Sequence, residues 1–477
     1  MATSFRDPAG RLLFVDGRVI RLINPSALQD FEDYLNSQTI RQLTDKGMVV
    51  RTEQLDESAI LQLSEHQKFK AAFDRAEVGA VVEHERIFFQ SFPYEWPPEM
   101  LWAAGVLTLD LAESLLPEGL CLKDATPYNI LYRGPQPVFV DLLSVERRSP
   151  NDPIWLPSEQ FQRTFLRPLL VNKHFDVGLD QTFLTHRDGL SPEEVYSLCG
   201  PLQKLSTSFL TLVSLPTLFS RPAISERPSI YQQQTTDNPD KARFILDRLL
   251  KGLRRKLESL RPGDERKSDW ADYTERNSYS ASYLPDKQRF VEQALEQEKP
   301  ERVLDVGCNT GDFSSMAARA GASVVAIDTD PVVVGKLWRR AQAERLRILP
   351  LVVDLSRPSP GIGWRNAECA SFLERARGSF DCVMMLAVIH HLLVSERIPL
   401  EEIMRLASEL TRGLLLVEYV SPEDPMSTVL ARGRDHLYAH LTRDYFEQVS
   451  RAYFEILRVA QLGRTERWIY LMRKRDG

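Results

Sequence analysis

The chain has 477 residues, more than one hydrophobic core usually organises, so its length predicts at least two domains. Hydrophobic residues make up 43% and charged residues 26%, which is ordinary for a soluble globular protein. The formal net charge of −6 argues against a dedicated nucleic-acid binder, because phosphate backbones demand a basic face.

The five cysteines are scattered without a C-x-x-C pair, so the sequence predicts neither a metal site nor a disulfide framework. The polar start, MATSFRDPAG, lacks the apolar core of a signal sequence. The most apolar stretch, 101–116, contains Asp110 and Glu113, is too short to span a bilayer and indicates a buried helix. We therefore predict a cytoplasmic protein with reduced cysteines and no membrane partner. The sequence does not indicate the oligomeric state.

The first part of the chain mixes strand-like and helical pieces. Residues 11–23, RLLFVDGRVIRLI, carry a turn signal at Asp16 and Gly17 that predicts a hairpin. From 99 to about 260 the pattern is mainly helical, interrupted by a strand pair within 130–143. The segment 261–269, RPGDERKSD, combines Pro, Gly and charge and is the best linker candidate.

After residue 300, short Val/Ile/Leu runs alternate with helical stretches. Near-continuous apolar runs between helices are typical of strands buried on both faces, hence of a parallel sheet. Right-handed crossovers then give a doubly wound, Rossmann-like α/β sheet of seven strands, with 453–462 and 466–474 as a terminal hairpin. The predicted domains are an α+β domain at 1–262, a linker with an aromatic segment at 263–289, and the sheet domain at 290–477.

A glycine-rich turn, VLDVGCNTG at 303–311, ends one predicted strand and opens a helix. Such a turn lets the backbone approach a ligand closely, and the helix N-terminus offers free N–H groups. The next two predicted strands end at Asp328 and Asp354. The carboxylate of Asp328 suits both ribose hydroxyls, and Asp354 suits the amino group of an adenine. These strand ends therefore predict a nucleoside site.

The charges indicate which nucleoside derivative binds. The third-glycine spacing that a dinucleotide pyrophosphate prefers is absent, and Asp305 directly precedes the loop. An acidic loop suits the ammonium group of S-adenosylmethionine better than it suits a pyrophosphate. The motifs VLDVGCNTGDFS, VVAIDTDP, LVVDLS and FDCVMMLAVIHHL resemble, in order and spacing, those of class I S-adenosylmethionine-dependent methyltransferases. The resemblance covers about 290–475.

The resemblance implies how the cofactor is bound. The loop would line the methionine moiety, Asp328 the ribose, and Asp354 with Leu355 the adenine. Asn309 stands where many members have glycine, and asparagine also tolerates a left-handed backbone. An aromatic segment at 270–287 either folds over the pocket or packs on the sheet as a helix. The expected cofactor contacts are Tyr279, Asp305, Gly307, Cys308, Asn309, Gly311, Asp328, Thr329, Asp354, Leu355 and Ala387.

Three residues are candidates for the catalytic side. His390 and His391 follow the fourth predicted strand, where a neutral imidazole could take a proton from a hydroxyl acceptor. The alternative is that one caps the following helix and the other packs on the ligand. Glu418 ends the fifth strand at the same edge. Because no Asn-Pro-Pro-Tyr signature follows the fourth strand, we predict an oxygen acceptor on a small molecule or glycan.

The N-terminal half carries a second motif. LKDATPYNILYRGPQPVFVDLL, 122–143, resembles the catalytic and metal-binding loops of kinase-like phosphotransferases. By that likeness Asp124 would be the base, and Asn129 and Asp141 would bind Mg²⁺. Leu122 replaces the supporting histidine, however, and residues 1–60 contain no glycine-rich phosphate loop. We therefore predict a degenerate kinase-like domain.

The whole arrangement resembles one bacterial group, methyltransferases related to host-specific nodulation proteins. The stretches SFPYEWPPEM, LKDATPYN, PVFVDLLSVE, GWRNAE, RARGSFD and LAVIHHL carry this likeness. It implies methyltransferase chemistry in a bacterial cytoplasm, without a settled acceptor. Two alternatives stay open: a bifunctional enzyme with ATP-dependent phosphotransfer in its N-terminal half, and a non-catalytic scaffold that senses S-adenosylmethionine.

Overall fold

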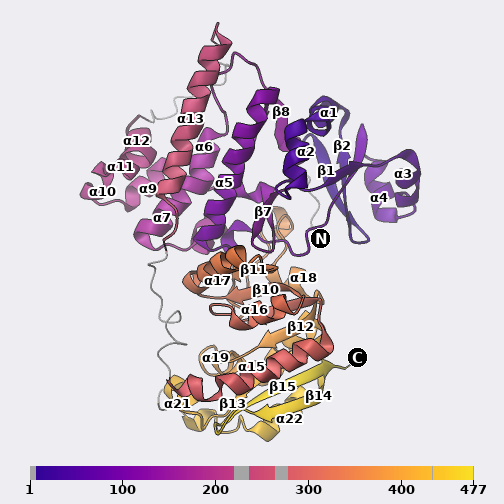
Figure 1. The fold of residues 1–477 in the computed structure, drawn as a ribbon, viewed down its shortest axis with the longest axis vertical. Coiled ribbons are helices and arrows are strands. Elements are labelled where there is room, and N and C mark those ends of the chain that lie inside the picture. The colour runs from indigo at the N-terminus through magenta and orange to yellow at the C-terminus, as the bar shows by residue number, and fades with distance from the viewer. Residues whose placement is uncertain (1–6, 220–235, 264–277, 432, 434, 476–477) are drawn as a thin grey trace. The chain divides into compact units, whose positions relative to one another are not determined.

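The structure is a computed structural model that describes residues 7–219, 236–263, 278–431, 433 and 435–475. The chain divides into two compact units (Figure 1). The N-terminal unit comprises Met1–Tyr132, Gln136–Pro262 and Ile362–Cys369, and the C-terminal unit comprises Arg133–Pro135, Gly263–Gly361 and Ala370–Gly477. The main change of unit along the chain thus falls between residues 262 and 263, and two short segments belong to the other unit.

The N-terminal unit begins with a four-stranded antiparallel sheet of order β1-β2-β4-β3. Its strands are β1 (Gly10–Val15), β2 (Arg18–Ile23), β3 (Thr52–Gln54) and β4 (Ala80–His84). Between β1 and β2, Asp16 and Gly17 both have positive φ, 46° and 81°, as a two-residue type I′ hairpin turn requires. The predicted hairpin is therefore confirmed.

Helix α5 (Pro98–Leu115) is the core of the helical part of this unit. By length and composition, the helical segment Pro98–Glu118 is long and apolar enough to cross a membrane, whereas the shorter stretch 101–116 is predicted to be too short. However, 61% of its most apolar part is buried inside the protein. Asp110 and Glu113 both pair with Arg254 of α13 (Pro239–Ser259), at 2.7 and 2.9 Å. The predicted buried helix is thus present.

Two short strand pairs carry the second motif of the sequence. Strand β5 (Leu120–Leu122) pairs with β8 (Val145–Arg147), and β6 (Ile130–Arg133) forms a two-stranded sheet with β7 (Gln136–Phe139). The other helices of the unit are α1 (Leu28–Asn36), α2 (Gln38–Asp45), α3 (Glu57–Leu63), α4 (Gln67–Phe73), α6 (Ser158–Phe161), α7 (Arg167–Phe175), α8 (Leu179–Thr185), α9 (Pro192–Leu198), α10 (Pro201–Leu205), α11 (Thr207–Phe209) and α12 (Leu215–Phe219).

The C-terminal unit is built on a seven-stranded sheet of order β11-β10-β9-β12-β13-β15-β14. The first five strands in this order are parallel, and β13, β15 and β14 pair antiparallel. The predicted doubly wound, Rossmann-like sheet and its terminal hairpin are therefore present. The strands are β9 (Arg302–Val306), β10 (Ser323–Asp328), β11 (Ile348–Val352), β12 (Phe380–Met385), β13 (Thr411–Val420), β14 (Phe454–Gln461) and β15 (Arg467–Lys474).

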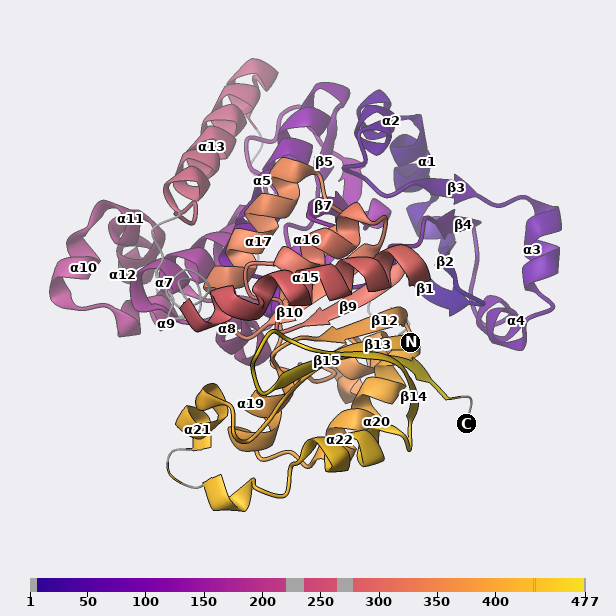
Figure 2. The same cartoon turned by 60° about the horizontal axis from the view of Figure 1, so that its bottom comes forward.

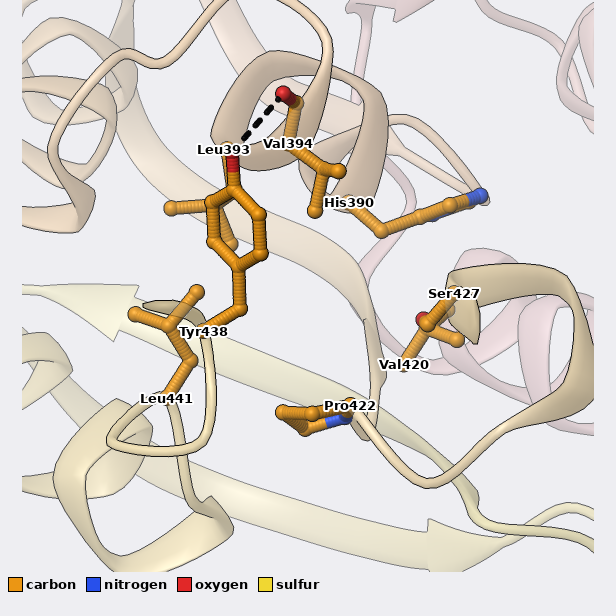
Figure 3. A pocket seen from close by; sticks show the side chains of 8 residues that line it. All are labelled: His390, Leu393, Val394, Val420, Pro422, Ser427, Tyr438 and Leu441. Atoms are coloured by element: carbon orange, nitrogen blue, oxygen red, sulfur yellow. Dashed lines mark hydrogen bonds between the residues drawn. The ribbon is translucent and has the colours of Figure 1, made fainter. Parts of the chain in front are cut away.

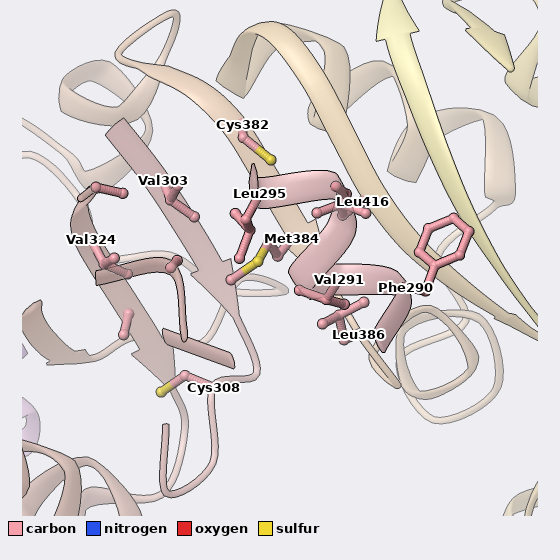
Figure 4. Close-up of a cluster of buried hydrophobic side chains, with 14 of the residues drawn as sticks. Phe290, Val291, Leu295, Val303, Cys308, Val324, Cys382, Met384, Leu386 and Leu416 are labelled. Atoms are coloured by element: carbon pink, nitrogen blue, oxygen red, sulfur yellow. The ribbon is translucent and has the colours of Figure 1, made fainter. Parts of the chain in front are cut away.

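Helices cover both faces of this sheet. Helix α15 runs along one face of the sheet (Figure 2). Its Phe290, Val291 and Leu295 belong to one buried cluster with strand residues such as Val303 and Met384 (Figure 4). On the opposite face, α22 packs through Phe446, whose ring lies 5.2 Å from that of Tyr470, centroid to centroid. The helices are α15 (Ser278–Glu298), α16 (Asp312–Arg319), α17 (Pro331–Glu344), α18 (Phe372–Ala376), α19 (Ile389–Val394), α20 (Leu400–Leu410), α21 (Pro425–Ala431) and α22 (Arg443–Ser450).

Candidate active site

The site lies where the order of the parallel strands reverses. From β9 the chain continues to β10 on one side, whereas β12 and β13 lie on the other side of β9. In open α/β sheets, ligands bind in the crevice outside the carboxyl ends of the strands at such a point. The loops after β9 and β12 approach closely here, because a Cβ atom added to Gly307 would lie 2.4 Å from Val388.

The backbone of the glycine loop adopts left-handed conformations that favour glycine and asparagine. Gly307, Asn309 and Gly311 have φ angles of 70°, 48° and 84°, all in the left-handed region. Glycine adopts this region freely, and asparagine tolerates it better than most residues. A Cβ added to Gly311 would also lie 2.1 Å from Leu337. A larger residue at 307 or 311 would therefore need a strained positive φ and would displace the side chain of Val388 or Leu337 at the N-terminus of α16.

The three predicted acids lie at successive strand ends of this edge. Asp328 accepts hydrogen bonds from the backbone amides of Asn309 and Asp330, at 2.9 and 3.1 Å. Each carboxylate oxygen keeps a second lone pair, so both remain able to accept a ribose hydroxyl. Asp354 accepts from the amide and hydroxyl of Ser356, at 2.8 and 2.6 Å.

Asp305 is the buried acid beneath the loop, with an exposed fraction of 2%. Burial raises its pKa to about 7, although the hydroxyl of Ser314 donates to its carboxylate at 2.5 Å and Lys287 attracts the ionised form. Burial also raises the pKa of Asp328. A cationic ligand group near Asp305 would favour its ionised form, so this carboxyl suits the ammonium of S-adenosylmethionine.

The other expected cofactor contacts are distributed along the same edge. Cys308 and Leu355 are buried, with exposed fractions of 7% and 8%, whereas Thr329 is exposed after β10. Ala387 follows β12 with φ of 59°, a conformation that costs free energy for alanine and is often found at functional sites. The side chain of Tyr279 lies outside the described residues. The residues that are described fit a nucleoside with a methionine tail.

The predicted catalytic histidines begin α19, directly after β12. His390 is 6% exposed, and its ring lies 4.3 Å from that of His391, centroid to centroid. Nδ1 of His390 is buried and has no hydrogen-bond partner among the described residues. Burial, His391 and the positive charges of Arg467 and Lys287 lower the pKa of His390 well below 6.5. Its imidazole is therefore neutral at pH 7.

A small pocket adjoins His390. Most of its lining side chains are apolar, and the hydroxyl of Tyr438 donates to the backbone carbonyl of Val394 at 3.2 Å (Figure 3). The nitrogen-bearing end of the His390 ring points away from Tyr438, so the stem of the histidine lines the pocket. The lining residues are His390, Leu393, Val394, Val420, Pro422, Ser427, Tyr438 and Leu441.

Glu418, the third catalytic candidate, is fully buried and held by two cations. Nζ of Lys287 lies 2.6 Å from one carboxylate oxygen, and the guanidinium of Arg467 lies 3.2 Å from the other. The sequence analysis did not single out Arg467. The predicted terminal hairpin indicates that its last strand, if antiparallel, begins at the carboxyl edge of the sheet, where Arg467 lies. It does not indicate which side chains Arg467 contacts.

The second motif, in the N-terminal unit, does not form an open metal site. Arg21 of β2 donates to one oxygen of Asp141 at 2.6 Å, and the hydroxyl of Ser144 donates to the other at 2.8 Å. The amide of Asn129 is directed to Ser144, at 3.0 Å. Within the described ranges, no group of three or more His, Cys, Asp or Glu side chains is placed to hold a metal ion. Asn129 and Asp141, the two metal ligands that the resemblance implies, are thus engaged by Ser144 and Arg21 in this structure.

Burial alone would raise the pKa of Asp141, but the charge of Arg21 and the hydrogen bond from Ser144 hold it below its usual value. The carboxylate is thus ionised and neutralised by a guanidinium from its own unit. Asp124 is partly buried, its pKa is raised by burial, and Gln160 donates to it at 3.5 Å. That this motif is a degenerate kinase-like one stays a prediction.

Comparison with known proteins agrees with the site of the C-terminal unit. Residues 276–461 match the model of a methyltransferase domain. The chain is 28% identical over 452 residues to the nodulation protein NoeA of Rhizobium meliloti (strain 1021). This alignment covers 94% of this chain and 90% of NoeA. A shorter match, 35% identical over 106 residues, is to the 23S rRNA (uracil(1939)-C(5))-methyltransferase RlmD of Pseudomonas fluorescens (strain Pf0-1), covering 21% of this chain and 23% of RlmD.

Among solved structures, the N-methyltransferase NodS from Bradyrhizobium japonicum WM9 in complex with S-adenosyl-L-homocysteine is 12% identical, with a TM-score of 0.31. The similarity covers 44% of this chain and 94% of NodS. The matched methyltransferase domain, 276–461, includes the glycine loop, the three acids, His390 and Glu418.

Replacing Asp328 with alanine should weaken S-adenosylhomocysteine binding by about a hundredfold, because two charge-assisted hydrogen bonds to the ribose are lost. The measurement is isothermal titration of the full-length variant. Asp381→Ala is the matched control, since Asp381 also accepts two backbone amides, at 3.1 and 2.9 Å, but sits at the start of β12 on the opposite edge. Equal affinity of the Asp328→Ala variant and the unmodified protein would refute the assignment of the ribose site.

The pKa of Asp305 predicts how cofactor affinity depends on pH. Binding of an ammonium group favours the ionised carboxyl of Asp305, so the affinity for S-adenosylhomocysteine should rise about tenfold between about pH 6 and pH 8. Near pH 7, binding should also release a proton from this carboxyl. Titration in two buffers of different ionisation enthalpy measures both quantities. Ser314→Ala removes the donor to Asp305 and should move the midpoint to higher pH. Affinity that is flat across this range would contradict the prediction.

The ion pair of Arg21 and Asp141 should stabilise the N-terminal unit. Arg21→Met leaves a largely buried carboxylate without its cation, so the free energy of unfolding should fall by about 3 kcal/mol in urea titration. Arg18→Met on the same strand is the control: Arg18 is 37% exposed and pairs with Glu83, so its loss should cost less than about 1 kcal/mol. An equal fall in the free energy of unfolding for the two variants would show that the buried ion pair stabilises the unit no more than the exposed one.

Proposed function

We propose that the protein, an S-adenosylmethionine-dependent methyltransferase, transfers a methyl group to a hydroxyl oxygen of a small molecule or glycan. The observation that supports this most strongly is the buried Nδ1 of His390, after the carboxyl end of β12, which has no hydrogen-bond partner in the part of the chain that the structure describes. A buried polar atom without a partner is costly unless a ligand or water completes it. The hydroxyl of an acceptor would complete it.

The cofactor supplies an electrophilic methyl group on a sulfonium. The chain's own residues hold it in place: the loop from Gly307 to Gly311 admits the methionine tail, Asp328 binds the ribose, and Asp354 receives the adenine amino group. Because both the loop and His390 lie at the point where the strand order reverses, the methyl group and the imidazole would face the same crevice. Holding the acceptor in line with the methyl group is then most of the catalysis.

His390 would act as the general base. A neutral imidazole accepts the hydroxyl proton as the oxygen attacks the methyl group, and the pKa of His390 keeps it neutral at pH 7. Glu418 does not suit this role, because Lys287 and Arg467 already neutralise it. His391, whose pKa is also lowered by burial, would pack against His390 and fix its ring.

The pocket beside His390 supports a neutral acceptor over a phosphorylated one. Five of its lining residues are apolar, its polar groups among the described residues are the hydroxyls of Ser427 and Tyr438, and His390 contributes the carbon stem of its side chain (Figure 3). An alcohol on a small molecule, or a sugar hydroxyl presented by its apolar face, fits such a lining. The acceptor of an N-methyltransferase such as NodS, a nitrogen, is the principal competing class.

Phosphotransfer by the N-terminal unit is not favoured, since the guanidinium of Arg21, 2.6 Å from Asp141, neutralises the charge that would bind Mg²⁺. The kinase-like character of residues 1–262 stays a prediction, supported by the order of an antiparallel sheet, the 123–129 loop and the β6–β7 hairpin. Titration with Mg²⁺·ATP discriminates the bifunctional alternative. Turnover of S-adenosylmethionine discriminates the sensing scaffold. A bacterial cytoplasmic location is part of this proposal.

The acceptor class is tested with ¹³C-methyl-labelled S-adenosylmethionine and the full-length protein, incubated with small-molecule and glycan fractions of a bacterial extract. The ¹³C chemical shift of the product distinguishes a methyl group on oxygen from one on nitrogen or carbon. Label on oxygen is expected. Label on nitrogen would overturn the oxygen assignment but keep the methyltransferase, and no labelled product with intact S-adenosylhomocysteine binding would favour the sensing scaffold.

His390→Gln should lower the rate of this transfer about a hundredfold or more, while S-adenosylhomocysteine affinity stays unchanged. Because the pKa of His390 lies well below 6.5, the rate of the unmodified enzyme should be level above about pH 6.5 and fall only in acid, as the imidazole takes up a proton. The variant should lose that acid limb. His391→Gln is the control and should keep it; equal losses in both variants would contradict the assignment.

A further inference from the structure

One guanidinium, that of Arg467 at the start of β15, joins three segments of the C-terminal unit. It is 2% exposed. Its Nε and Nη2 donate to the two carboxylate oxygens of Asp424, at 2.9 and 3.0 Å. Its Nη1 donates to Glu418 of β13 at 3.2 Å and to the hydroxyl of Tyr283 of α15 at 2.9 Å. The forked contact to Asp424 is the strongest geometry that an arginine and a carboxylate form.

On the other side of Glu418, the network reaches the cofactor loop. Lys287 of α15 lies 2.6 Å from Glu418 and 4.9 Å from the centre of the Phe313 ring. Phe313 belongs to the first turn of α16, directly after the glycine loop. Lys287 also acts on Asp305, since its charge favours the ionised form of that carboxyl. Lys287 is therefore in contact with the side of the site that would bind the methionine tail.

On the side of Asp424, the network reaches the pocket beside His390. Asp424 is fully buried, and it lies within residues 420–427, three of which line that pocket: Val420, Pro422 and Ser427. We call residues 420–427 the acceptor wall. The wall begins at Val420, the last residue of β13, and ends in the first turn of α21, so residues 421–424 between them form a loop. The backbone of Ser421 donates to the carbonyl of Glu466 at 3.0 Å, and the side chain of Asp424 joins this loop to Arg467 at the start of β15.

We propose that Arg467 is a positioning residue for methyl transfer, which holds the acceptor wall in register with the cofactor loop through Asp424, Glu418 and Lys287. This inference rests on the proposed function, because it concerns the same site. Four charged side chains in contact, each no more than 6% exposed, form a continuous chain from Phe313 to the acceptor wall. A purely structural role predicts a stable wall whether or not the cofactor is bound; a positioning role predicts that the cofactor tightens it.

The residue types suit this role. Burying two carboxylates and two cations together is tolerated because each has an oppositely charged partner in hydrogen-bond contact. A lysine at 467 would provide one point of charge and could not bind both oxygens of Asp424 while reaching Glu418 and Tyr283. The arrangement therefore depends on the planar fork of arginine, which fixes the angle between β13, the acceptor wall and α15.

The test is hydrogen exchange of the full-length protein, followed by mass spectrometry with and without S-adenosylhomocysteine. In the unmodified protein, the cofactor product should slow exchange in the glycine loop and also, by about fivefold, in peptides covering the acceptor wall. In the Asp424→Asn and Arg467→Lys variants, S-adenosylhomocysteine should still bind with an affinity within about threefold of that of the unmodified protein, and it should still protect the glycine loop. The added protection of the acceptor wall should be lost. Arg467→Met is avoided because it removes the guanidinium from the fully buried carboxylate of Asp424.

Arg473→Met is the matched control. Arg473 lies on the same strand, is 52% exposed and pairs with Glu298, so the cofactor-dependent protection of the wall should survive its loss. Protection of the wall that persists in both test variants would overturn the inference, as would its absence in the unmodified protein. Failure of S-adenosylhomocysteine to bind the unmodified protein would instead refute the proposed function, so the two failures are distinguishable.

Discussion

Parallel pairing of β9 with β10 on one side and β12 on the other is the constraint on which the site depends. It brings the loops after β9 and β12 to one edge, so closely that a Cβ added to Gly307 would lie 2.4 Å from the side chain of Val388. The glycine loop, Asp328, Asp354 and His390 all lie at or just after the carboxyl end of a strand at this edge. The function therefore follows from the topology of the sheet, and the identities of loop residues decide which ligand it takes.

Buried charge is handled in the same way in both units. In the N-terminal unit Arg21 neutralises Asp141, and in the C-terminal unit Arg467 and Lys287 neutralise Glu418 and Asp424. Each carboxylate would be costly to bury alone, and each cation removes that cost without an added ion. The consequence differs between the units: the first arrangement closes a motif that resembles a metal site, and the second leaves His390 uncharged beside an open pocket.

Much of the C-terminal unit could be predicted from sequence because its signals are local. Buried parallel strands are near-continuous apolar runs, and Asp328 and the glycine loop occupy fixed places relative to those runs. The role of Arg467 could not be predicted in this way, since its partners at 283, 418 and 424 are joined to it only by tertiary packing. The environment of Asp141 has the same origin: the motif around it is local, but Arg21, which fills its coordination space, comes from a distant strand.

The position of Arg467 also has a consequence for how the site is assembled. β15 is the last strand of the sheet to be synthesised, yet it inserts between β13 and β14 and carries the guanidinium that ties down the acceptor wall. The glycine loop and its three acids all precede this strand in the chain, as does the acceptor wall. The cofactor side of the site therefore draws its residues from segments made earlier, whereas the acceptor wall gains its contact with Arg467 only when the last strand has been made.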